Sequence, residues 1–152
     1  GGNPNDVAQT IWDTKPAGVE THGDITTIVI DASSEVQAVS WSRPTPIYLD
    51  VRVTYELYDE EVFPTNGDDL ITEAVLNYAN SMSIGEDVIP TRFIGSIYKA
   101  TEGVGNVLVE IGTSTLPTDP TPTAWQTTPI AIARGEYASL ATGRIVVINN
   151  TP

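Results

Sequence analysis

The segment from Tyr48 to Leu57 constrains the fold most strongly, because apolar and polar side chains alternate along it without interruption. As a β-strand, it directs these two sets of side chains to opposite faces. Pairing shifted by one residue would expose the whole apolar set, so the strand has one acceptable register and can act as a template for its neighbours. The apolar set is Ile47, Leu49, Val51, Val53, Tyr55 and Leu57, and the polar set is Tyr48, Asp50, Arg52, Thr54 and Glu56.

Three segments carry the start signals and apolar periodicity of α-helices. The first begins at Pro4, a residue favoured in the first turn of a helix. The second follows the long strand, where Thr65 and Asp68 fit a capping box. The third begins at Pro90 and ends before Gly103. We expect the second helix to cover the strand with an apolar face made of Ile71, Val75, Tyr78 and Met82.

Further strands are predicted on both sides of these helices. Residues 25–30 and 36–41 flank a polar turn and predict a hairpin, and residues 107–111 alternate as another strand. Two short strands are expected at 130–132 and 144–148, after a Thr/Pro-rich exposed loop over 114–128. This order predicts an α+β fold: a mixed or mainly antiparallel sheet with about three helices, two of them packed on one face.

The length of 152 residues fits one domain, so we expect a single domain over 1–152. The alternative is a helix-and-hairpin subdomain over 1–45 beside a main body over 46–152. The chain begins with two glycines, and its single methionine is Met82. We therefore expect a fragment of a longer protein.

Composition disfavours several classes of function. Twenty acidic residues against seven basic ones give a net charge of −13, which would repel nucleic acid. No apolar run approaches the roughly 20 residues of a membrane helix, so we expect no membrane insertion. The absence of cysteine excludes disulfides and thiolate chemistry, and leaves a zinc ion one histidine and carboxylates as ligands.

No set of catalytic residues stands out. The chain lacks a nucleophile-elbow motif and a second histidine, and Arg134 with Glu136 is most simply an exposed pair. Calcium could accept oxygen ligands from Asp59–Glu61, Asn66, Asp68 and Asp69, but the spacing of an EF-hand loop is missing. A solvated loop that caps the following helix is favoured. We therefore predict no enzyme activity, no cofactor and no metal site.

Among the three tryptophans, Trp125 is the best candidate for contact with another chain. Trp12 and Trp41 lie within apolar periodicity and are expected in the core, whereas Trp125 lies in the polar loop. The polar face of the long strand is expected to be either solvated or shared with a neighbouring subunit. The interface candidates are therefore Trp125, Tyr48, Arg52 and Glu56. The alternative is a glycan-binding module that uses Trp125 as a stacking platform.

Several segments, in their order and spacing, carry a family resemblance. They are Gly2–Gln9, Lys15–Gly23, Ser42–Pro44, Ile84–Val88, Phe93–Ile97, Gly103–Val107, Glu136–Ala138 and Gly143–Val147. Together they resemble the C-terminal part of baseplate J-like proteins of contractile phage tails. The resemblance covers most of the chain except the loop over 114–128, which departs from the family pattern.

The resemblance implies a structural component of a phage or prophage tail baseplate, and implies no catalytic residues. Its implied partners are copies of itself and other baseplate proteins. Its implied location is the virion, with assembly in the cytoplasm of the bacterial host.

Overall fold

The computed structural model describes residues 2–118, 122 and 124–152. The chain forms two compact units, Gly1–Arg43 and Pro44–Pro152. Within the described residues there are three α-helices, none of which is long and apolar enough to cross a membrane.

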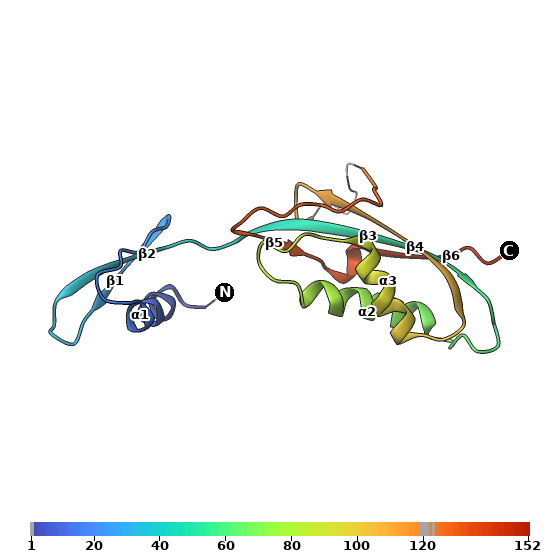
Figure 1. The fold of residues 1–152 in the computed structure, drawn as a ribbon, viewed down its shortest axis with the longest axis horizontal. Helices are drawn as coiled ribbons and strands as arrows, with labels where there is room; N and C mark the ends of the chain where they lie inside the picture. Colours follow the sequence, from blue (N-terminus) through green and yellow to red (C-terminus); the bar gives the residue numbers. More distant parts are fainter. Residues whose placement is uncertain (1, 119–121, 123) are drawn as a thin grey trace. The chain divides into compact units, whose positions relative to one another are not determined.

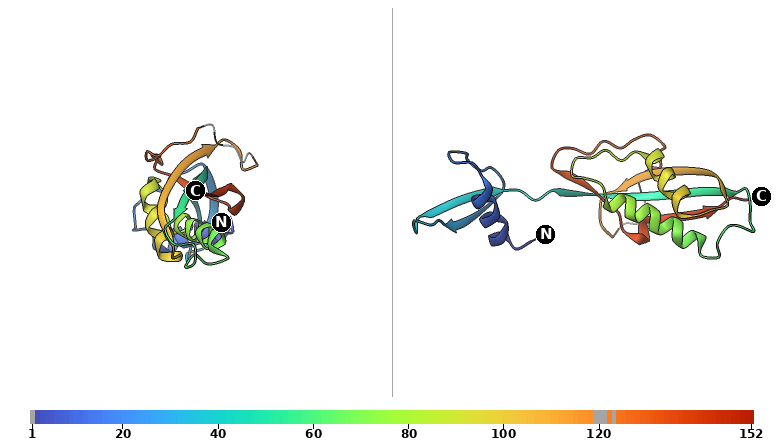
Figure 2. Two further views of the ribbon diagram at one scale, coloured as in Figure 1. Left: turned by 90° about the vertical axis from the view of Figure 1, so that its right-hand side faces the viewer. Right: turned by 60° about the horizontal axis from the view of Figure 1, so that its bottom comes forward.

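The first unit consists of helix α1 (Pro4–Thr14) and a hairpin of β1 (Ile25–Ile30) and β2 (Val36–Trp41), as the sequence predicts. The side chain of Asn3 caps α1 by accepting a hydrogen bond from the backbone N–H of Asn5 at 2.9 Å. One face of the hairpin packs against α1 (Figure 2). Its buried side chains are Ala8, Val29, Val39 and Trp41, and Trp12 is partly buried beside them.

The second unit is built on strand β3 (Thr45–Leu57), which pairs antiparallel with β4 (Val104–Ser114). On its other side, β3 pairs in parallel with β5 (Glu136–Ser139) and with β6 (Ile145–Asn149), which follows a short 3₁₀ helix at Thr142–Arg144. Helices α2 (Gly67–Asn80) and α3 (Pro90–Ala100) pack together on one face of this sheet (Figure 1). The predicted α+β fold is confirmed.

The alternation along β3 decides where the core lies. Leu49, Val51, Val53 and Tyr55 are buried, and they face the buried side chains of α2 and α3. Burying an aliphatic or aromatic side chain of this size stabilises a fold by about 1.5–3 kcal/mol. The helices contribute Ile71, Val75, Ala79, Phe93 and Ile97 to the same core.

The predicted capping box at Thr65 and Asp68 is wrong. Helix α2 begins at Gly67, and its N-cap residue makes no side-chain hydrogen bond. The carboxylate of Asp68 instead accepts a hydrogen bond from the Tyr55 hydroxyl at 2.6 Å, and burial together with this bond raises the pKa of Tyr55. The Asp68 carboxylate, which in a capping box would accept from a backbone N–H at the start of α2, is therefore bonded to a strand of the sheet instead.

The strand predicted over 130–132 is also wrong. Ile130 makes one isolated antiparallel bridge with Val88, and the strand lies later in the chain, at β5. Strand β3 begins earlier than the alternating segment predicts, because Thr45 and Pro46 already belong to it and pair with β5. The backbone N–H of Thr45 donates to the carbonyl of Gly135 at 2.9 Å, which starts this parallel pairing.

The substitution Val51→Asp tests the buried face of β3. It places an unpaired carboxylate between the sheet and the helices, which costs several kcal/mol against a typical domain stability of about 5–15 kcal/mol. We expect thermal denaturation followed by circular dichroism to show no cooperative unfolding. The control Thr54→Asp, on the opposite face of the same strand, should melt cooperatively. A Val51→Asp variant with the melting curve of the wild type would contradict the assignment.

Candidate functional site

All four interface candidates belong to one surface, which we name the outer sheet face: the face of the β3–β6 sheet opposite α2 and α3. Tyr48, Arg52 and Glu56 alternate along β3 with the buried apolar residues and therefore lie on this face. The indole ring of Trp125 lies over the Arg52 guanidinium, 4.6 Å from it. The structure thus brings together residues that are up to 77 positions apart in the sequence.

Trp125 is held at this place by the edge of β4. The neighbouring residue Gln126 exchanges two backbone hydrogen bonds with Ile111, each of 2.9 Å. Because Ile111 belongs to β4, the loop returns to the sheet at this point like a short extra strand. The side chain of Trp125 is partly buried, and it has a contact inside its own chain through the cation–π interaction with Arg52.

Arg52 also forms an ion pair across the strands. It faces Glu110 in the register of β3 with β4, and its Nε donates to Glu110 Oε2 at 2.7 Å. This hydrogen bond lowers the pKa of Glu110 and raises that of Arg52. The contribution of Glu110 to stability is present above the ordinary glutamate pKa and is lost as the pH falls through the lowered value. Both side chains remain partly exposed, so the pair contributes modestly.

A buried ion pair, Asp50–Arg144, lies next to Arg52 along the outer sheet face, and sequence analysis missed it. Their side chains are only 1% and 6% exposed, and Arg144 Nη1 lies 3.0 Å from both oxygens of Asp50. The hydroxyl of Ser114 donates to Asp50 Oδ2 at 2.6 Å. The guanidinium of Arg144 also lies over the ring of Tyr48, 5.5 Å from its centre. The expectation that Asp50 is solvated or shared with a neighbouring subunit is therefore wrong, because its own chain covers it.

This ion pair fastens the start of the loop after β4. Arg144 Nη2 donates to the carbonyl of Leu116 at 2.6 Å. A side chain at Gly112 would collide with Pro122 and with the carbonyl of Ala124, so these two residues of the loop lie directly over this glycine. The described parts of the loop are largely exposed, as predicted, but they are anchored to the sheet at Leu116 and Gln126.

Glu56 and the acidic loop after β3 have local hydrogen-bonding roles. Glu56 accepts hydrogen bonds from the side-chain amides of Asn106 and Asn150, at 3.5 and 3.2 Å. Asp59 accepts from the backbone N–H groups of Glu61 and Val62. Across the residues that the structure describes, no three His, Asp or Glu side chains are grouped so that they could hold a metal ion.

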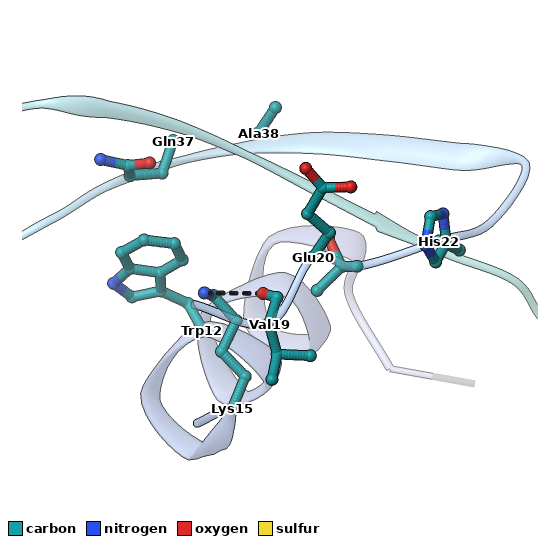
Figure 3. Close-up of a pocket in the computed structure, with 8 residues that line it drawn as sticks. Trp12, Lys15, Val19, Glu20, His22, Gln37 and Ala38 are labelled. Atoms are coloured by element: carbon teal, nitrogen blue, oxygen red, sulfur yellow. Dashed lines mark hydrogen bonds between the residues drawn. The ribbon is translucent and has the colours of Figure 1, made fainter. Parts of the chain in front are cut away.

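A pocket of about 400 Å³ in the first unit lies between the end of α1 and β2 (Figure 3). The Lys15 ammonium lies 4.4 Å from the centre of the Trp12 ring and donates to the carbonyl of Val19 at 3.2 Å. The amide of Gln37 donates to Asp31. The pocket is therefore lined by side chains that already contribute to the packing of this unit. His22, at its rim, is exposed.

Apolar side chains on the far side of the hairpin form a second surface that sequence analysis missed. Ile28, Ile30 and Val36 are 61%, 66% and 67% exposed, although all three lie in regular strands. The sequence did indicate this surface, because β1 and β2 carry apolar residues at both odd-numbered and even-numbered positions, and these point to opposite faces of the hairpin. A smaller group, Leu108, Val146 and Ile148, is exposed on the outer sheet face.

No model of a known protein family matches the chain, and the comparison with curated proteins found no match. The resemblance to baseplate J-like proteins therefore rests on the segments quoted above.

The substitution Arg144→Met tests the buried ion pair. It leaves the Asp50 carboxylate buried without its counter-charge, and we expect the free energy of unfolding in urea to fall by about 3–5 kcal/mol. The matched control Arg52→Met breaks the partly exposed pair with Glu110, and should cost about 1 kcal/mol. Equal losses in the two variants would show that Asp50 is not the more deeply buried charge.

Proposed function

We propose that this protein is a structural component of a contractile-tail baseplate of a phage or prophage, and that it acts by protein–protein assembly. The ordered resemblance of eight segments to baseplate J-like proteins motivates the assignment to a baseplate. The exposed apolar side chains Ile28, Ile30 and Val36 carry the assembly role, because contiguous exposed apolar surface typically marks a contact with another molecule.

The construction of the second unit supports a structural role. A 13-residue central strand, two covering helices and the buried Asp50–Arg144 pair produce a body with one defined arrangement. The same strand presents Tyr48, Arg52 and Glu56 to the outer sheet face, where Trp125 covers part of it. Such a body can repeat the same contact around a symmetry axis and close a ring with its copies and neighbouring proteins.

Electron microscopy of the tailed particle that carries this chain tests the proposal. An antibody fragment raised against the chain, or a density map in which the chain can be traced, should locate it at the baseplate. Particles from a host in which the gene has been deleted are the control for the label, and they should lack assembled baseplates. Localisation to the capsid, the sheath or the host membrane would refute the assignment.

The alternative, a glycan-binding module built around Trp125, stays a prediction. The exposed threonines that follow Trp125 in the chain, Thr127 and Thr128, would supply a polar fringe. Its test is a glycan array probed with the wild type, with Trp125→Ala and with Trp12→Ala as the control. Glycan binding that is lost in Trp125→Ala and kept in the control would support this function. A wild type that binds no glycan on the array would refute it.

A further inference from the structure

The hairpin of the first unit has an open apolar face. We name it the outer hairpin face: the side of β1 and β2 opposite α1. The register pairs its residues in three rows, and Figure 3 shows Ala38 pointing away from Trp12 of α1. The three rows are Thr26 with Ser40, Ile28 with Ala38, and Ile30 with Val36.

The inner face alone provides a small core for this unit. Four residues are buried between α1 and the hairpin: Ala8, Val29, Val39 and Trp41. A two-stranded sheet is marginally stable in water, and small units usually depend on disulfides, metals or association. This chain contains no cysteine, and the described residues hold no metal-binding cluster. Covering the outer hairpin face would therefore complete the unit.

The chemistry of this face suits an uncharged apolar partner. None of its six side chains is ionisable, although the chain carries a net charge of −13. The two hydroxyls at one end satisfy each other, because Thr26 Oγ1 and Ser40 Oγ lie 3.1 Å apart. Burial of the face would thus desolvate no charge and leave few polar groups unpaired. A strongly basic or acidic partner would find no counter-charge here.

We propose that the outer hairpin face binds the same face of a second copy of this chain, in a two-fold symmetric contact. Two copies of an acidic chain can approach through this neutral patch while their acidic residues stay in solvent. The two copies present identical surfaces, as an isologous contact requires. This inference rests on the proposed function in one respect: it assumes that the protein acts by assembly, and it names a second copy of the chain as the partner of the outer hairpin face.

The size of the face sets the expected strength. Ile28, Ile30 and Val36 together expose on the order of 300 Å² in each copy. With the smaller side chains of the face, two copies would bury roughly 800–900 Å² in total, below the size of a standard specific interface. We therefore expect weak association, with half of the chains dimeric at a concentration on the order of 10–100 µM.

Sedimentation equilibrium of the full 152-residue chain tests the contact. The wild type should change from monomer to dimer across the range from about 1 µM to 1 mM. The double variant Ile28→Thr/Ile30→Thr keeps β-branched side chains in the strand but removes apolar area, and should weaken association at least tenfold. The matched control, Val146→Thr/Ile148→Thr on β6, should associate like the wild type. A wild type that stays monomeric at about 1 mM would overturn the proposal.

Cross-linking provides a second measurement that does not depend on how well the threonine variants fold. Because the chain has no cysteine, one introduced cysteine can be linked only to a second copy. Ala38 lies in the middle row, so a two-fold contact brings its two copies within roughly 10 Å, and Ala38→Cys should give dimers with a short bis-maleimide. The control Thr127→Cys, on the exposed loop of the second unit, should stay monomeric. Equal cross-linking at both positions would show that the outer hairpin face is not the contact.

The two proposals can fail separately. A monomeric chain that electron microscopy places in the baseplate would remove the hairpin contact and leave the proposed function intact. A chain that dimerises through the outer hairpin face but is found outside the baseplate would refute the proposed function and leave the hairpin contact intact.

Discussion

The second unit depends on the single register of β3. Its apolar side chains meet α2 and α3, and every other strand of this sheet pairs directly with it. A slip of one residue would place Asp50 and Arg52 in the core and expose Val51 and Val53, so all three pairings are set together. The strand therefore determines both the core and the identity of the residues on the outer sheet face.

The outer sheet face is organised by two ion pairs with different surroundings. Asp50 and Arg144 are buried, accept or donate further hydrogen bonds, and hold the start of the long loop at Leu116. Arg52 and Glu110 remain partly exposed, and their contribution is modest. Removing one partner of a buried pair leaves an uncompensated charge, so the first pair contributes more to stability than the second and also fixes the described start of the loop at Leu116.

The first unit follows a different rule, because its two strands are apolar on both faces. The helix covers one face through Val29, Val39 and Trp41, and the described residues of this unit provide no element to cover Ile28, Ile30 and Val36. Two-sided apolar strands are typical of sheets buried on both sides. The unit thus carries a surface suited to assembly, whereas the second unit has buried most of its apolar residues within itself.

Local patterns in the sequence were sufficient to predict α1, the hairpin, the apolar face of β3 and the start of α3 at Pro90, because caps, prolines and side-chain alternation act over a few residues. The sequence also singled out Trp125 and Arg52, but it carried no sign of their mutual contact. Only the tertiary structure paired Asp50 with Arg144, diverted Asp68 from capping to Tyr55, and placed β5 rather than 130–132 beside β3. These contacts join residues that are 13 to 94 positions apart in the sequence. Such residues meet only when the strands and helices pack together, so local sequence patterns do not reveal them.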